Sequence, residues 1–429
     1  MISFTAGVQP VDPAVLVFMA FLSGLFLFLG LRAGQRRRLL DDTPTSKTLG
    51  IFIGEVEVEG VGISTSPIRA KFCYQDCVVY SWGIDEEWQR WETVVYTDSR
   101  GRTSTRQVLR RGWTTIASDS IYKGFYIKDE FGYVWVHPKG ADCETLTLFN
   151  ETTQRGESLY SMGPDDSIMD STGRRRFYES GLPVGTELFV RGRASERPDI
   201  VAPQIVEDPQ AEMFIITHRK EKDISSGKAT AYVLWNLVGL VTALGIGALL
   251  TPNDLKGPAM GVAIYSFVWF MGWLWMVFNS LIGLRNRVQQ AQSLIDVQLK
   301  RRSDLIPPLI ASLKGLRDYE AQVQTEIATL RGQSMGTNQV SALVPGLKAI
   351  IEKYPELIAN ESFNALMKNL TETEDRIALA RNYANDVTTF YNTRLERIPD
   401  RFVAQIVAMQ PALLFVAQGF EHKVPDVKI

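Results

Sequence analysis

The sequence has few of the side chains that most often carry out catalysis or bind metal. It contains three cysteines and three histidines in 429 residues. Cys73, Cys77 and Cys143 are an odd number without C-x-x-C spacing, which argues against a disulfide framework and against a zinc knuckle. A metal set with His137 is the alternative, but Cys77 opens an apolar run and is expected to be a small core residue. We therefore expect no metal site and a reducing compartment.

Motifs that would indicate an enzyme are also missing. The sequence has no P-loop, no G-x-G-x-x-G after a strand and no Ser/His/Asp grouping. Its net charge of −2 gives no general reason to expect nucleic acid as a partner. The longest apolar runs contain no Asp, Glu, Lys or His, which argues against a transporter or channel. The prediction is a protein that is not an enzyme, with no catalytic residue and no cofactor.

What the sequence does have is three apolar runs of the length that a membrane helix needs. We expect membrane helices at 13–34, 229–250 and 258–281, with a short extracytoplasmic N-terminus at 1–12. The second and third should form a hairpin around a short turn. A cleaved signal peptide is the alternative for the first run, but its arginines follow the apolar residues, which is the reverse of a signal peptide.

Basic residues flanking these runs predict the orientation, because they are retained in the cytoplasm during insertion. They follow the first run, precede the second and follow the third, so the regions 43–226 and 282–429 should both be cytoplasmic. The arginines nearest the membrane are candidates to contact lipid phosphates, with anionic lipid as a possible partner, or only to set topology. These candidate membrane-surface residues are Arg32, Arg36, Arg37, Arg38, Arg285 and Arg287. The basic cluster 300–302 lies farther along and is assigned to helix pairing.

Between the first and second runs, residues 43–226 alternate apolar and polar residues in short segments separated by Gly, Pro and Asp. This pattern predicts about eight strands in a small barrel or sandwich, with a hairpin turn at Asp129–Gly132. Two polar stretches rich in Ser, Thr and Arg, Thr97–Arg111 and Ser161–Arg176, are predicted to be hairpin tips or mobile loops.

The last region, 282–429, predicts long helices. Apolar residues at spacings of three and four indicate one buried stripe on each of two helices, as in a coiled coil. The predicted seam residues are Ile306, Leu309, Leu313, Leu316, Val323, Ile327, Phe363, Leu366, Leu370, Ile377, Val387 and Tyr391. We expect an antiparallel hairpin or bundle, closed by a last apolar helix at 401–417 that bends at Pro411. The fold class is thus membrane α+β, with three membrane helices, a small strand-rich domain and an all-α region.

Two resemblances rest on longer motifs. The segments FNSLIGLRNRV (278–288), IDVQLKRRSDLIPPL (295–309) and 371–399 resemble the LemA family. The segments STSPI (64–68), CVVYSWGIDEEW (77–88), 125–141 and 182–194 resemble the GIDE-type domain of membrane proteins that include mitochondrial E3 ubiquitin ligases. The LemA resemblance implies a bacterial inner membrane protein from a family with no established catalytic activity. Those ligases carry a C-terminal RING finger, which is absent here because no cysteine follows Cys143, so ligase activity is not transferred.

These observations lead to one main functional expectation. Apolar surface left over by a single helical hairpin calls for further partners, so we expect a scaffold that self-assembles through its long cytoplasmic helices and organises or shapes the membrane. Its partners would be other copies of itself, the bilayer and an unknown protein, without nucleic acid. The alternative is a signalling or quality-control adaptor whose β domain binds a protein or peptide.

Overall fold

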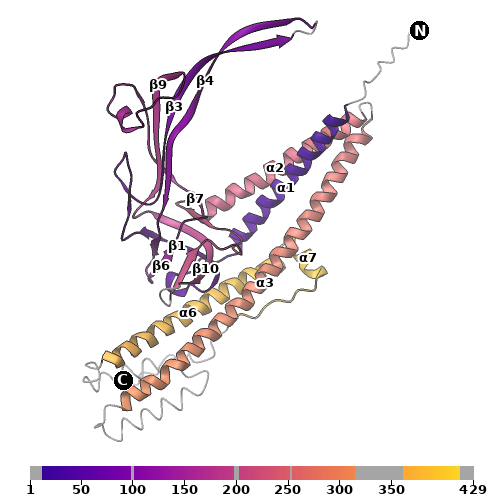
Figure 1. Cartoon of the computed structure of the whole chain (residues 1–429). Coiled ribbons are helices and arrows are strands. Elements are labelled where there is room, and N and C mark those ends of the chain that lie inside the picture. Colours follow the sequence, from indigo (N-terminus) through magenta and orange to yellow (C-terminus); the bar gives the residue numbers. More distant parts are fainter. Residues whose placement is uncertain (1–11, 98–100, 198–201, 252–253, 315–360, 416–429) are drawn as a thin grey trace, which may run out of the picture. The chain divides into compact units, whose positions relative to one another are not determined.

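The computed structural model describes residues 12–97, 101–197, 202–251, 254–314 and 361–415 (Figure 1). The chain divides into two compact units. The strand unit is Thr45–Lys220, and the helical unit joins Met1–Pro44 to Glu221–Ile429.

The strand unit contains a small closed sheet. Its strands are β1 (Gly54–Ile63), β5 (Phe125–Lys128), β6 (Tyr133–Val136), β7 (Asp142–Glu144), β10 (Glu187–Glu196), β11 (Pro203–Val206) and β12 (Ile215–Thr217). The order is β1-β5-β6-β11-β10, and β10 pairs back onto β1. This circuit is that of a small barrel, one of the two predicted arrangements.

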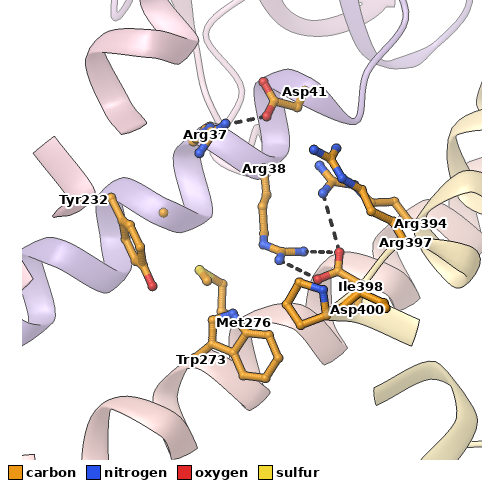
Figure 2. Close-up of a pocket in the computed structure, with 12 residues that line it drawn as sticks. Arg37, Arg38, Asp41, Tyr232, Trp273, Met276, Arg394, Arg397, Ile398 and Asp400 are labelled. Carbon is orange, nitrogen blue, oxygen red and sulfur yellow. Dashed lines mark hydrogen bonds and ion pairs between the residues drawn. The ribbon is translucent and has the colours of Figure 1, made fainter. Parts of the chain in front are cut away.

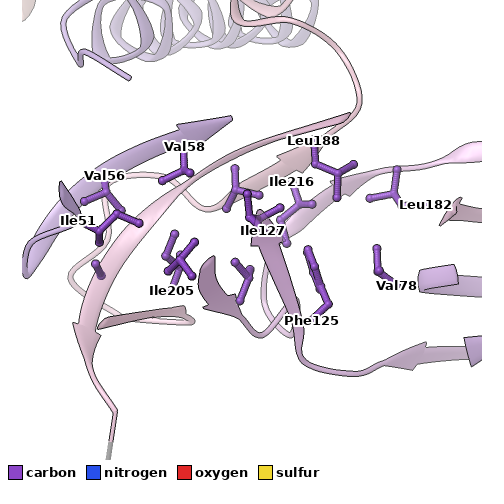
Figure 3. Close-up of a cluster of buried hydrophobic side chains, with 14 of the residues drawn as sticks. Ile51, Val56, Val58, Val78, Phe125, Ile127, Leu182, Leu188, Ile205 and Ile216 are labelled. Atoms are coloured by element: carbon purple, nitrogen blue, oxygen red, sulfur yellow. The ribbon is translucent and has the colours of Figure 1, made fainter. Parts of the chain in front are cut away.

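Alternation along these strands fills the barrel with aliphatic side chains (Figure 3). Val58, Ile127, Val136, Val190 and Ile205 are fully buried. Burying each side chain of this size stabilises the fold by roughly 1.5–3 kcal/mol relative to exposure. The predicted hairpin is present, because β5 and β6 pair with Lys128 opposite Tyr133 and the Asp129 carboxylate accepts from the backbone N–H groups of Phe131 and Gly132.

A second sheet carries the longest strands. Its members are β2 (Ile68–Arg69), β3 (Asp76–Thr97), β4 (Thr103–Tyr122), β8 (Leu146–Gln154) and β9 (Ser171–Pro183), in the order β2-β3-β9-β8 with β4 paired to β3. Short 3-10 turns lie at Thr48–Gly50 and Tyr160–Met162.

The stretches Thr97–Arg111 and Ser161–Arg176 were predicted to be hairpin tips or mobile loops. The end of the β3–β4 hairpin does lie in the first stretch, but most of that stretch and part of the second are strand instead of loop. Residues from Thr103 onward belong to β4, and the ladder with β3 is continuous from Thr97 opposite Thr103. Polar Thr and Ser suit a strand exposed on both faces, because β-branched Thr favours extended backbone even without an apolar partner. Likewise Ser171–Arg176 opens β9.

The helical unit contains five described helices: α1 (Pro13–Asp41), α2 (Glu221–Leu250), α3 (Lys256–Lys314), α6 (Glu361–Glu396) and α7 (Asp400–Ile406). The Asp12 carboxylate accepts from the backbone N–H of Ala14 and caps α1, whose first residue is proline. By length and composition, α1, α2 and the first part of α3, Lys256–Leu305, are each able to cross a membrane.

Small residues let the second and third of these helices meet. A Cβ added at Gly247 would overlap the backbone of Gly257, and one added at Gly261 would overlap the carbonyl of Ala243. This close approach of backbones is the arrangement that small residues permit in membrane helices.

Beyond the apolar run, α3 and α6 pack side by side (Figure 1). A buried cluster joins Leu281, Leu284 and Val288 of α3 to Val387 and Tyr391 of α6. Farther out, Arg302 forms an ion pair with Glu374, with 3.3 Å between Nη1 and Oε1. The predicted stripe on α6 is therefore buried against the chain's own α3.

The predicted helix at 401–417 was wrong in extent, because α7 ends at Ile406. The described residues after it lie along α6 in non-helical conformation. Asn392 exchanges two hydrogen bonds of 2.9 Å with the backbone of Ala412, and Asn385 pairs in the same way with Phe415 at 2.8 and 3.2 Å. Pro411 has no N–H to offer a helix, while each asparagine supplies both a donor and an acceptor to an extended backbone.

Candidate functional site

A group of buried and half-buried charges, which we call the ionic cluster, lies where α1 ends. It comprises Arg38, Asp42, Arg287, Arg394 and Asp400. Asp400, the first residue of α7, is only 2% exposed. The guanidinium of Arg38 donates two hydrogen bonds to its carboxylate, at 2.8 and 2.7 Å, and Arg394 approaches the same group at 3.5 Å. The bidentate geometry is the strongest that an arginine and a carboxylate form.

Asp42, just beyond α1, is the second acid of the cluster. Its carboxylate accepts hydrogen bonds of 2.8 Å from Arg394 Nε and from the hydroxyl of Ser280. Burial raises the pKa of Asp42, and the nearby Arg394 only partly opposes this shift. Arg287 of α3 donates to the carbonyl of Asp42 at 3.3 Å and to the hydroxyl of Thr43 at 2.8 Å. The cluster thus connects α1, α3, α6 and α7.

A cavity of about 250 Å³ opens beside this cluster (Figure 2). It is lined by Gly34, Arg37, Arg38, Asp41, Tyr232, Trp273, Met276, Arg394, Arg397, Ile398, Pro399 and Asp400. Four arginines against two aspartates leave the lining with an excess of two positive charges. One wall is aromatic and apolar, and the other is cationic.

The four arginines differ in how far they are already paired. Arg38 and Arg394 are held by Asp400 and Asp42. Arg37 is 3.5 Å from Asp41 in an exposed pair within one helix, and such pairs contribute little. Arg397 is exposed and has no ion pair with any residue in the described part of the chain. Two guanidinium groups at this cavity therefore retain donors for an anion.

The predicted membrane-surface arginines fall into two groups. Arg32, Arg37 and Arg285 are exposed and Arg36 is half-buried, whereas Arg38 and Arg287 belong to the ionic cluster. Sequence reasoning missed the acids Asp42 and Asp400, which explain why those two arginines turn inward. Nothing in the sequence pattern marked them, since Asp400 is 362 residues from its partner.

The predicted seam residues are placed as follows. Leu370, Ile377, Val387 and Tyr391 are buried and Leu366 is half-buried. Ile306, Leu309 and Leu313 lie on α3 and Phe363 on α6, while Leu316, Val323 and Ile327 lie outside the described residues. The role of all twelve in assembly stays a prediction.

Two of the three cysteines have thiols that burial makes harder to ionise. Cys77 is buried, and burial raises the pKa of its thiol to about 11; the pKa of Cys143 is raised to about 11 for the same reason. Within the described ranges, no group of three or more His, Cys, Asp or Glu side chains is arranged to hold a metal ion.

The strand unit has a buried carboxylate, Glu179, whose pKa is shifted in the direction opposite to that of Asp42. Glu179 accepts hydrogen bonds from the backbone N–H groups of Phe72 and Cys73, at 2.7 and 2.9 Å, and from the Tyr80 hydroxyl. Burial alone would raise the pKa of Glu179, but these donors outweigh it and lower the pKa.

Comparisons with known proteins match two separate regions of the chain. Residues 291–429 match the LemA family, and residues 93–249 match the GIDE family, which is described as E3 ubiquitin ligase. The chain is 26% identical over 191 residues to Protein LemA of Metamycoplasma hominis, covering 40% of this chain and 87% of that protein. It is 24% identical over 205 residues to Magnetosome protein MamQ 1 of Paramagnetospirillum magneticum, covering 38% of this chain and 75% of the relative. The chain therefore joins a C-terminal region that matches the LemA family to a middle region that matches the GIDE family, and its motifs had indicated both resemblances.

Proposed function

We propose that this protein is a non-enzymatic, membrane-anchored scaffold that self-associates on one face of a bacterial inner membrane. Three helices able to cross a membrane, and relatives named for LemA and for magnetosomes, support a bacterial membrane protein. If all three helices cross, the strand unit and the distal part of α3 emerge on the same side. The flanking arginines make that side the cytoplasm.

The helices provide an extended arm in this proposal. Val288 and Tyr391 share one buried cluster near the membrane, and Arg302 pairs with Glu374 farther out, which fits an antiparallel pair of α3 and α6. The predicted stripe on α6 is largely buried within one chain, so it is not available to other copies. A self-associating protein therefore needs a different surface.

The observation that carries the proposal is the free end of the β3–β4 hairpin. Beyond Trp88 and Ser171, β3 has no described strand partner except β4, and β4 pairs only with β3 along its whole length. Three apolar residues of this two-stranded ribbon, Trp91, Val95 and Tyr96, are 65%, 59% and 50% exposed. An isolated two-stranded ribbon is marginally stable in water, and open edges readily take another strand.

A second copy of the chain is the partner that best fits the open edges and exposed apolar side chains of this ribbon. Each copy would contribute the same open edges and the same exposed side chains, so that pairing buries both partners' apolar residues at once. Repetition of one contact by proteins fixed in a common bilayer produces a closed ring or an extended array. Such arrays organise the membrane to which they are anchored.

The test is to shorten the ribbon without disturbing the strands beneath it. Residues 93–107 are replaced by Asn-Gly, which joins Glu92 to Val108, two residues that face each other across the ladder. Light scattering after size exclusion in mild detergent should show a large assembly for the natural chain and small species for the shortened one. Tyr133→Ser, which removes an aromatic side chain 59% exposed outside the ribbon, should leave the assembly intact. A monodisperse monomer of the natural chain would refute the proposal.

The same open edge supports the second candidate, an adaptor. A peptide from another protein could add to β4 as an extra strand, with main-chain hydrogen bonds providing affinity. A photo-crosslinking residue at position 96 distinguishes the two in cells. Adducts between copies favour the scaffold, and one recurrent foreign partner favours the adaptor.

A further inference from the structure

We propose that the arginine-lined cavity of the helical unit binds the phosphate of an anionic phospholipid. The chemistry it recognises is a phosphate group attached to an apolar body. This inference concerns the membrane end of the helical unit and does not depend on self-association.

The position of the cavity is the first argument. Its lining includes Arg37 and Arg38 near the end of α1, Tyr232 at the start of the apolar run of α2, and Trp273 and Met276 near the end of the apolar run of α3. Each of three helices that can cross a membrane contributes lining residues near the end of its apolar run. The cavity therefore lies at the level of the membrane surface, where apolar residues give way to charged ones. Tyr and Trp are typical of that level. Lipid phosphates lie there too.

The charge of the cavity is the second argument. Asp400 and Asp42 already satisfy Arg38 and Arg394, so these two hold the wall in place. Arg37 and Arg397 come from α1 and from the turn before α7, and both line the same opening (Figure 2). Two guanidinium groups from different elements can donate to the oxygens of one phosphate, and arginine favours such contacts.

The third argument is the apolar surface next to the opening. Ile398 of the lining is 67% exposed, and Phe402 and Ile406 on α7 are 56% and 80% exposed, while Val403 and Ala404 pack inward. A short helix with one apolar face outward beside a basic patch is typical of an element that lies in the membrane interface. Acyl chains would cover these residues while the headgroup occupies the cavity.

A free phosphate ion or an acidic segment of another protein would share the charge but not the surroundings. Neither explains exposed Ile398, Phe402 and Ile406 at the level where the spans end. A lipid accounts for both the cationic wall of the cavity and the exposed apolar residues beside its opening. We therefore assign the cavity to a lipid.

The experiment measures lipid retention by the full chain. The protein is purified in a neutral detergent, and dioleoylphosphatidylglycerol or dioleoylphosphatidylcholine is titrated while native mass spectrometry counts adducts. Arg37→Gln and Arg397→Gln remove the charge and the guanidinium fork of the two available arginines without touching Arg38 or Arg394. Arg401→Gln is the matched control, because Arg401 is an exposed arginine in the same segment that does not line the cavity. Glycerol 3-phosphate is titrated in parallel as the phosphate without the acyl chains.

We expect the natural chain to retain phosphatidylglycerol in preference to phosphatidylcholine. Each cavity variant should bind phosphatidylglycerol roughly tenfold more weakly than the Arg401→Gln control, the loss typical of one hydrogen bond to a charged group. Equal weakening by Arg401→Gln would reduce the effect to general surface charge and overturn the proposal. Competition by glycerol 3-phosphate as effective as the lipid would overturn it as well, because the apolar wall would then contribute nothing.

Discussion

Both units bury arginine–carboxylate pairs, but they position them differently. In the strand unit, Arg191 faces Glu57 and Arg175 faces Glu86, and each pair consists of residues directly opposite in a β ladder. Backbone hydrogen bonds already fix those partners. In the helical unit, no backbone ladder joins one helix to another, and Arg38 meets Asp400 from 362 residues away. There the side chains themselves set how the helices are joined, so we expect the helical unit to depend far more on its charges.

The largest effect on the helical unit is expected for Asp400→Ala. The substitution leaves the half-buried Arg38 without its partner. Removing one member of a buried pair costs about 3–5 kcal/mol, and we expect the lower end of that range because Arg38 keeps some exposure to solvent. Hydrogen exchange should rise at 38–44 and 400–406 in the full chain, with no change in the strand unit.

The control for that experiment is Lys256→Ala, which breaks an exposed pair with Asp254 in which the lysine is 89% exposed, and which keeps the hydrogen bond from the Lys256 backbone N–H to Asp254. Exposed pairs contribute roughly 0–1 kcal/mol, so little change is expected. Replacing both partners, Arg38→Met with Asp400→Leu, should restore part of the protection, because it removes the unpaired charge. Equal effects of the two single substitutions would show that the ionic cluster does not hold α1 to α7.

A second prediction concerns how the helices of the membrane region meet. Gly261→Ala places a methyl group against the carbonyl of Ala243, and overpacking of this kind costs roughly 1–3 kcal/mol. Thermal unfolding in detergent should shift to lower temperature. Gly24→Ala, at a glycine of α1 with no atom within 4 Å of the added Cβ, is the control and should not destabilise. The comparison fails if both alanines behave alike.

A third prediction uses the opposite pKa shifts of two buried acids. Asp42 has a pKa raised above its ordinary 3.8, so the folded state binds more protons and its contribution to stability falls as pH rises from 3.8 through the folded pKa. Glu179 has a pKa below its ordinary 4.5, so its contribution is present above 4.5 and is lost as pH falls through the folded pKa.

Thermal unfolding in detergent across the acidic range separates these two contributions. In the natural chain, Asp42 makes stability fall as pH rises, and Asp42→Asn should abolish that fall. Glu179 makes stability fall as pH decreases, and Glu179→Gln should abolish that second fall. Each slope is read as the difference from the natural chain at the same pH. Slopes of the same sign would mean that the two acids are held in the same way.

Much of the architecture could be predicted from local pattern. Apolar runs of sufficient length predicted the three candidate membrane helices, and alternation predicted strands in a small barrel or sandwich, of which the barrel is present. The buried stripe of α6, with Ile377 and Val387, followed from helical spacing. Each of these signals lies within about 20 consecutive residues, which is the range over which periodicity is informative.

What could not be predicted depends on partners far apart in the chain. The polar start of β4 resembles a loop until its pairing with β3 is known. Arg38 and Arg287 look like surface residues until Asp400 and Asp42 are placed beside them. The apolar segment after α7 favours a helix by composition. Its extended form depends on two asparagines of α6 that no local pattern connects to it.

Substituting one of these asparagines should give the smallest loss of stability, confined to the segment after α7. Asn392→Ala removes both hydrogen bonds to Ala412, at about 1 kcal/mol each, while Asn385 still holds Phe415. We expect faster hydrogen exchange at 410–414 and unchanged exchange at Arg38. Asn369→Ala, at an exposed asparagine of the same helix, is the control. If the segment is held instead by Met409 and Ala412, which pack against the apolar cluster of α3 and α6, Asn392→Ala will match the control. Hydrogen bonds from side chains to backbone thus fix the position of the segment after α7, just as backbone hydrogen bonds of the β ladders fix the strands of the strand unit.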